Sequence, residues 1–135
     1  MLLTKFWDYL LKNFKLHPKR TTKQITGERA EKIAEEYLIA NGLKIIGRNI
    51  KTQNHNQKGE IDLLCKDGPL IVFVEVRYRK INSWISAGKS INPKKKRILV
   101  RTAKLLMKKM GIIQARIDAI LIDEGKEIVW VKNLI

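Results

Sequence analysis

The sequence predicts a single α/β domain, because two segments with helical periodicity alternate with short apolar runs bounded by turn residues. The chain has 135 residues, of which 44% are hydrophobic, and it contains only 8 Gly and 3 Pro. This length and composition are typical of one folded domain with one hydrophobic core. After a leading helix, the expected order of elements is α-β-β-β-α-β-β.

Residues 1–14 are predicted to form an amphipathic helix, with apolar side chains on one side and lysines on the other. Its apolar face can pack on the domain or a partner, or lie on an anionic membrane surface. A basic linker follows. We therefore divide the chain into residues 1–24, the helix and linker, and residues 25–135, the folded domain.

The first helix of the domain is predicted over 26–41, where apolar residues recur at helical spacing before Asn41 and Gly42. A first strand over 43–50 and a polar loop over 51–59 come next. Two apolar runs then flank residues 67–70, which predicts a β-hairpin.

A second helix is predicted over 92–110, because Asn92 is a candidate N-cap, Pro93 suits the first turn and Gly111 closes an apolar stripe. Two further strands, 115–123 and 127–132, are joined across 124–126. No internal repeat or low-complexity segment interrupts the pattern.

The charge of the chain is strongly positive, with 28 Lys and Arg against 13 Asp and Glu, a net charge of +15. Such an excess favours a polyanionic partner, either nucleic acid or an anionic membrane. The second helix is the most basic segment, and its charges do not alternate in sign, so ion pairs within the helix do not explain them. Phosphate contacts are the favoured interpretation and a solvated face is the alternative. The residues expected to contact nucleic acid are Lys58, Arg79, Lys94, Lys95, Lys96, Arg97 and Arg101.

Other features of the sequence limit the possibilities. No apolar run reaches the ~18 residues of a membrane span, and the first residues lack the pattern of a signal peptide, so a cytoplasmic location is expected. Cys65 is the only cysteine, and its apolar surroundings predict a buried thiol. Trp84 is a candidate for stacking on a base, with core packing as the alternative.

Three acidic residues, Glu60, Asp62 and Glu75, lie on the predicted hairpin. If residues 67–70 form the loop, Asp62 faces Glu75 and Glu60 faces Arg77. Like charges directly opposite each other are destabilising, and a divalent cation such as Mg²⁺ would resolve the conflict. Phosphodiester hydrolysis is the chemistry that such a site suggests, with Arg77 stabilising developing charge. The alternative is plain salt bridging, with Glu60 paired to Arg77 and Asp62 to a neighbouring Lys or Arg.

Six motifs, in this order, resemble the YraN family of bacterial proteins: "TGERAEKIAEEYLIANG", "GRNIK", "GEIDLL", "VFVEVRYR", "NPKKKRI" and "ARIDAI". That family in turn resembles the PD-(D/E)XK nuclease superfamily and its Holliday-junction resolvases. The resemblance runs from about Gly27 to the C-terminus. It implies a restriction-endonuclease-like α-β-β-β-α-β core with a mixed central sheet, to which this chain adds a C-terminal strand and the N-terminal helix.

The resemblance also implies roles for individual residues. Asp62 and Glu75 match the two acidic metal ligands, with Mg²⁺ or Mn²⁺ as the implied cofactor. Glu31 matches the assisting glutamate of the first helix, and Glu60 matches the glutamate of the "GEID" motif. Arg77 stands where the superfamily pattern has lysine.

An arginine at position 77 keeps the positive charge and can grip a phosphate, but it stays protonated and cannot act as a base. A lysine from another element, either Lys58, Lys94 or Lys95, is a candidate to replace the missing amine. The expected function is therefore that of a Mg²⁺-dependent phosphodiesterase acting on structured or branched DNA. A non-catalytic DNA- or RNA-binding module with a degenerate nuclease site is one alternative, and a membrane-associated scaffold is another.

Overall fold

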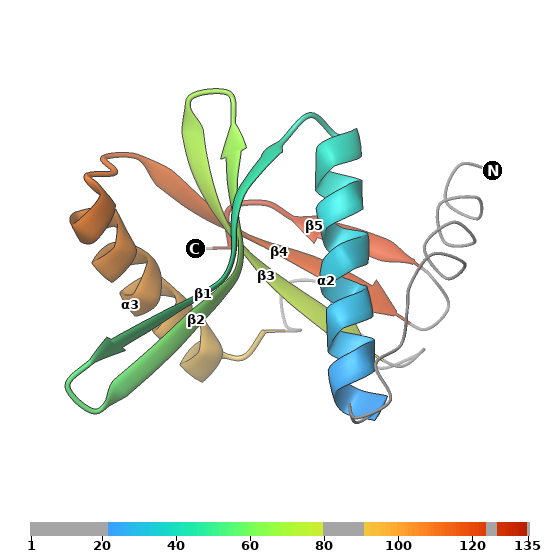
Figure 1. The fold of residues 1–135 in the computed structure, drawn as a ribbon, viewed down its shortest axis with the longest axis horizontal. Helices are drawn as coiled ribbons and strands as arrows, with labels where there is room; N and C mark the ends of the chain where they lie inside the picture. The colour runs from blue at the N-terminus through green and yellow to red at the C-terminus, as the bar shows by residue number, and fades with distance from the viewer. Residues whose placement is uncertain (1–21, 80–90, 124–126, 135) are drawn as a thin grey trace.

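The computed structural model describes residues 22–79, 91–123 and 127–134, and it contains a five-stranded mixed sheet with two helices (Figure 1). The strands lie in the order β1-β2-β3-β4-β5, and neighbouring strands are antiparallel except for the parallel pair β3 and β4. The predicted order α-β-β-β-α-β-β and the mixed α/β sheet are confirmed. The elements are α2 (Thr22–Ala40), β1 (Lys44–Asn54), β2 (Gln57–Asp67), β3 (Leu70–Arg79), α3 (Pro93–Met110), β4 (Ala115–Asp123) and β5 (Ile128–Val131).

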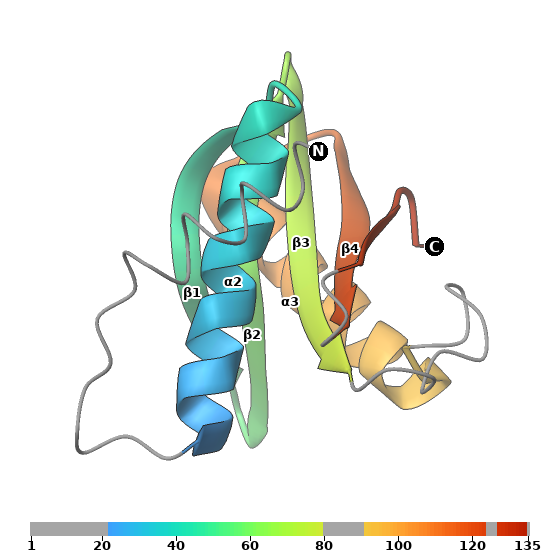
Figure 2. The same ribbon diagram turned by 90° about the vertical axis from the view of Figure 1, so that its right-hand side faces the viewer.

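The described elements form three layers, with α2 on one face of the sheet and α3 on the other (Figure 2). The cluster under α2 contains Ala34 and Leu38 of the helix, packed on Cys65, Val72 and other strand residues. The cluster under α3 contains Leu99 and Leu106 of that helix, packed on Phe73, Leu64 and Leu121. Two apolar clusters of this kind explain why the central strands read as nearly continuous apolar runs.

The ends of α3 are those that its capping residues predict, whereas the start of α2 differs from the prediction. Helix α3 has Asn92 as its N-cap, with Oδ1 accepting a 2.8 Å hydrogen bond from the Lys95 amide, and Gly111 in the left-handed conformation at its end. Helix α2 begins at Thr22, so the predicted boundary between residues 24 and 25 lies inside the helix.

The segment 51–59 is not the polar loop that its composition predicts. Strand β1 continues to Asn54 and β2 begins at Gln57, and the two pair through Thr52↔Gly59 and Asn54↔Gln57. Apolar periodicity could not reveal these strands, because their side chains are polar and only one of them, Thr52, is buried.

The predicted register of the β2–β3 hairpin is confirmed over its first half. Lys66 pairs with Ile71 and Leu64 with Phe73. The described ladder ends at Leu63↔Val74, however, so the expected pairs Asp62–Glu75 and Glu60–Arg77 do not form as ladder pairs. Ile61 packs in the same cluster as Leu64, three residues away, so the alternation of faces is interrupted here and β2 separates from β3.

Further predictions on single residues have mixed outcomes. Cys65 is a buried free thiol, as expected, and burial together with nearby Asp118 raises its pKa to about 12. In the described part of the chain, no helix is both long enough and apolar enough to cross a membrane. The predicted helix over 1–14, Trp84 and the Arg79 side chain lie outside what the structure describes.

Candidate active site

Asp62 and Glu75 meet where β2 separates from β3. The Asp62 Oδ2 atom accepts a 2.8 Å hydrogen bond from the Val76 amide, which the interrupted ladder leaves available. Glu75 is only 4% exposed. Burial, followed by the charge of Asp62, raises the pKa of Glu75 to about 7. Asp62 also contributes through a side-chain hydrogen bond with Glu75, so the two carboxyl groups share this position despite the lost ladder pairing.

Lys95 reaches this carboxylate pair from helix α3. Its Nζ atom lies 3.2 Å from Glu75 Oε1, whereas Arg77 Nη1 lies 3.9 Å from the same oxygen. Of the three lysines considered as a substitute for the motif lysine, Lys95 is the one that contacts the acidic residue. The Asn92 cap fixes the turn from which Lys95 extends.

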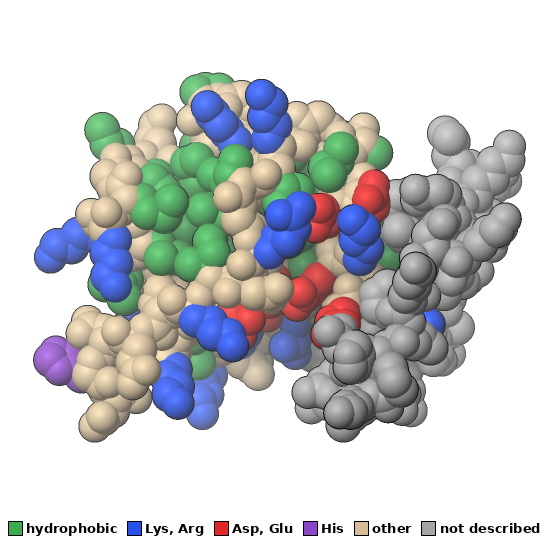
Figure 3. All heavy atoms as spheres, viewed as in Figure 1, with side chains coloured by type: hydrophobic (Ala, Val, Ile, Leu, Met, Phe, Trp, Pro, Cys, Tyr) green, Lys and Arg blue, Asp and Glu red, His purple; other side chains and the backbone are tan. Residues whose placement is uncertain are grey.

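Glu31 brings helix α2 into the same group of charges. Its pKa is raised to about 7, first by burial and then by the charge of Asp62, and Glu60 adds to the effect. A side-chain hydrogen bond with Asn49 opposes this shift. Figure 3 shows acidic side chains gathering between the β1–β2 hairpin and α2, with Lys and Arg side chains beside them.

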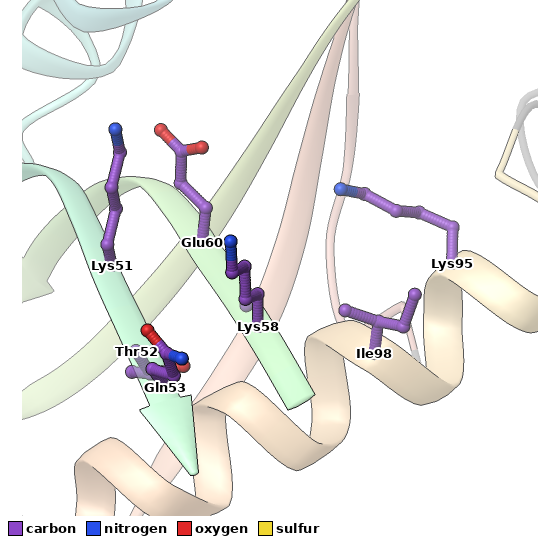
Figure 4. A pocket seen from close by; sticks show the side chains of 8 residues that line it. Lys51, Thr52, Gln53, Lys58, Glu60, Lys95 and Ile98 are labelled. Atoms are coloured by element: carbon purple, nitrogen blue, oxygen red, sulfur yellow. The ribbon is translucent and has the colours of Figure 1, made fainter. Parts of the chain in front are cut away.

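A cavity of about 770 Å³ is lined by residues of the β1–β2 hairpin and of α3, including Lys95, which contacts Glu75 (Figure 4). In Figure 4, Lys51 and Glu60 extend from the hairpin in the same direction, and Lys95 extends from α3 toward the strands. Three lysines on one opening provide the charge that a phosphodiester backbone requires. The cavity is lined by Lys51, Thr52, Gln53, Lys58, Gly59, Glu60, Lys95 and Ile98.

The predicted nucleic-acid contacts do not all lie at one place. Lys58 and Lys95 line the cavity of about 770 Å³. Lys96, Arg97 and Arg101 instead line a second hollow of about 660 Å³, together with Val100, Lys104 and Leu134. Lys94 is exposed and lines neither of these hollows.

A site with only two carboxylate ligands can hold some metal ions but not others. Among the described residues, no three His, Cys, Asp or Glu side chains gather closely enough to form a metal site by themselves. Mg²⁺ commonly takes one or two carboxylates and fills its remaining positions with water and substrate phosphate. Asp62 and Glu75 fit that pattern, because both offer oxygen, and a cation would favour the ionised form of Glu75, whose pKa is raised by burial and then by the charge of Asp62.

Comparison with known proteins shows the family to which the chain belongs. The sequence model of uncharacterised protein family UPF0102 matches residues 30–122. The chain belongs to the UPF0102 family. This is the YraN family that the sequence motifs resemble. A UPF0102 protein of Dichelobacter nodosus is 36% identical over 127 residues, covering 90% of this chain and 98% of its own. Another, from Vibrio campbellii, is 37% identical over 119 residues, covering 84% and 94% of the two chains.

The UPF0102 match spans the second half of α2, all of β1 to β3 and α3, and most of β4, so every residue of the carboxylate site lies within it. The sequence did not show which of three lysines, Lys58, Lys94 or Lys95, reaches the acidic residues, and the structure shows that Lys95 contacts Glu75. A local signal for it exists: three consecutive lysines, Lys94 to Lys96, stand in the first turn of α3, where the helix dipole disfavours cations. Lysines in that position indicate an anionic partner from outside the helix.

Proposed function

We propose that this UPF0102 protein is a metal-dependent phosphodiesterase that cleaves structured or branched DNA. One observation supports the proposal most strongly. A buried glutamate with a pKa near neutrality lies against a second carboxylate and a lysine amine, beside a cavity lined with further lysines. Perturbed carboxyl groups of this kind in a cleft are typical of catalytic sites.

Each residue of the site has a chemical role in this proposal. Asp62 and Glu75 hold a divalent cation, which supplies Lewis acidity and a more acidic water when bound. Lys95 stabilises the negative charge that develops on the phosphoryl oxygens, and Arg77 grips a non-bridging oxygen of the same phosphate. Glu31, with a pKa of about 7, can accept and release a proton near neutral pH.

A non-catalytic nucleic-acid-binding module is the second candidate, and a specific observation favours it. Glu75 already has two cationic neighbours, Lys95 and Arg77, which offset part of its negative charge without a metal. In that case the site is a structural ion-pair network, and the basic cavity alone is functional. Arg77→Lys separates the two candidates, because it restores the superfamily pattern and should match or exceed wild-type cleavage only if the site is catalytic.

The experiment offers the full-length protein single-stranded, duplex and four-way-junction DNA, with Mg²⁺, Mn²⁺ or EDTA, and measures binding and cleavage separately. Cleavage that requires the metal, disappears in Glu75→Ala and favours the junction is the expected result. The Glu75→Ala preparation also identifies a contaminating nuclease, whose activity would persist. Binding without any metal-dependent and Glu75-dependent cleavage by wild type or Arg77→Lys would support the binding module instead.

A further inference from the structure

The β1–β2 hairpin continues beyond the rest of the sheet as a two-stranded arm, which we define as residues 51–60. Within the arm the strands pair only with each other, through Lys51↔Glu60, Gln53↔Lys58 and Asn54↔Gln57, because the described β2–β3 ladder has ended at Leu63↔Val74. The arm leaves the body of the domain at the lower left of Figure 1. Because no other strand of the described residues pairs with the arm, its edges and tip are open to a partner.

Helix α3 holds the base of the arm in place. Gly59 lies so close to the helix that a Cβ atom there would stand 2.0 Å from Thr102 Oγ1. Its pairing partner Thr52 is buried, and Arg101 Nη2 donates a 3.4 Å hydrogen bond to the Lys58 carbonyl. The arm is therefore fixed in direction relative to α3, although its tip extends into solvent.

The side chains of the arm are those of a polar recognition element. Because side chains alternate along a strand, and the Thr52↔Gly59 pair faces α3, the pairs Lys51↔Glu60 and Gln53↔Lys58 share the opposite face. The tip carries an imidazole and several amides, which offer both donors and acceptors of hydrogen bonds. All the tip residues are exposed: Gln53, Asn54, His55, Asn56 and Gln57.

The dimensions of the arm fit one nucleic-acid groove. Paired strands lie about 4.8 Å apart, and the major groove of B-form DNA, about 12 Å wide, admits a two-stranded β-ribbon with its side chains. The A-form major groove of duplex RNA is deep and narrow, and a single strand has no groove. The geometry points to insertion of the hairpin arm into the major groove of duplex DNA, with Lys51 and Lys58 at the phosphates and the tip amides at the base edges.

This inference deepens the proposed function. Binding of duplex DNA by the arm stands by itself, and what it implies for cleavage rests on the proposed function. Lys51, Lys58 and Glu60 of the arm line the same cavity as Lys95, and Asp62 follows Glu60 by two residues on the same strand. A duplex held by the arm is thus delivered beside the carboxylate site. The substrate of the site is then double-stranded on the arm side of the scissile phosphate.

Binding of the full-length protein to duplex DNA, duplex RNA and single-stranded DNA, all in EDTA, tests the inference. The charge variant is Lys51→Ala/Lys58→Ala. Its matched control is Lys44→Ala/Lys66→Ala, which removes two exposed lysines that pair at the other end of the same hairpin. An uncharged variant, Gln53→Ala/Gln57→Ala, removes amides and leaves the net charge unchanged. Thermal melts establish that each variant is folded.

The charge variant should lose about tenfold in affinity for duplex DNA, and the slope of log affinity against log salt should fall by about two, one for each phosphate contact. The control should keep the wild-type slope. The amide variant should weaken duplex DNA binding several-fold and leave single-strand binding unchanged, and wild type should prefer duplex DNA to duplex RNA.

Equal losses in the two lysine pairs would overturn groove insertion, because they would show an effect of net charge alone. Equal affinity for duplex RNA and duplex DNA, an unaffected amide variant, or no DNA binding at all would also overturn it. Because these measurements contain no divalent cation, they do not depend on cleavage. If the protein binds duplex DNA through the arm but never cleaves it, the proposed phosphodiesterase activity is refuted and the inference of groove insertion still holds.

Discussion

Lys95 extends from α3 toward the carboxylates, and its amine lies 3.2 Å from Glu75 Oε1. We expect Lys95→Ala to lower the rate of metal-dependent cleavage by about 10²-fold, the usual effect of removing one positioned transition-state contact. Lys108→Ala removes the same charge from the last turn of the same helix and serves as the control. Single-turnover cleavage of a four-way junction measures both. Equal rates for the two variants would show that Lys95 only adds to the overall charge.

Asp62→Asn tests whether the carboxylates repel each other or are held by ion pairs. The asparagine oxygen can still accept the Val76 hydrogen bond, so the change removes one charge and little else. At pH 8, where Glu75 is ionised, the variant should be as stable as wild type or more stable, because burial of Glu75 is unchanged and the repulsion from Asp62, the second cause of its raised pKa, is removed. Urea unfolding measures the free energy of unfolding, and a clear loss of stability would favour salt bridging.

At the scale of elements, the contact between β2 and α3 depends on the missing side chain of Gly59. A Cβ atom there would stand 2.0 Å from Thr102 Oγ1, and Thr102 is buried with its hydroxyl donating to the Ile98 carbonyl. We expect Gly59→Ala to lower the free energy of unfolding by about 1–3 kcal/mol, since either the hairpin or the helix must shift.

The control for this prediction is Gly27→Ala in α2, where a Cβ atom would meet nothing within 4 Å. That change should stabilise the protein by up to about 1 kcal/mol, because alanine favours a helix more than glycine does. Thermal and urea unfolding of both variants provide the comparison. A Gly59→Ala protein as stable as wild type would show that the helix and the hairpin are not in tight contact.

The sequence predicted elements well wherever their signals are local. The Asn92 cap, Pro93 and Gly111 define α3 within a few neighbouring residues, and the turn at Gly68 sets the register of Leu64 with Phe73. The arm was missed because its strands have no apolar alternation and are ordered by pairing with each other and by contact with α3. The end of the β2–β3 ladder before Asp62 was also missed. The separation of β2 from β3 depends on tertiary packing, which the neighbouring residues in the sequence do not reveal.

The acidic residues of the candidate site could be predicted from the sequence, but the lysine that contacts them could not. Asp62 and Glu75 were predicted from their spacing and Glu31 from the family resemblance, and the charge of Asp62 raises the pKa of both glutamates, which shows that it lies close to each. Which lysine accompanies them could not be predicted, because Lys95 and Glu75 are 20 residues apart and meet only when α3 packs across the sheet.

At the scale of the whole molecule, two raised carboxyl pKa values give stability a defined dependence on pH. Glu31 and Glu75 have pKa values of about 7 against an ordinary 4.5, so between these pH values the folded chain binds more protons than the unfolded chain. Their contribution to the free energy of unfolding therefore falls as pH rises from about 4.5 to about 7, and it is constant above that range.

Thermal melts between pH 5 and pH 8 should show this decline, and Glu75→Gln should reduce its slope because one of the two titrating groups is removed. Carboxylates with lowered pKa values, such as Glu35 beside Arg48, affect stability mainly below this window. The comparison between the two proteins thus isolates Glu75. A slope that is the same in wild type and Glu75→Gln would contradict the assigned pKa.

Calorimetric titration of Mn²⁺ into the full-length protein tests the central claim, that Asp62 and Glu75 form a metal site. We predict one ion bound per chain, with proton release near pH 6.5 because Glu75 must ionise to coordinate the ion. Binding should be lost in Glu75→Ala, be weakened in Asp62→Asn and be retained in Glu36→Gln, which removes a glutamate paired with Lys32 on α2. Binding of equal strength in Glu75→Ala and wild type, or no binding to wild type, would contradict the account.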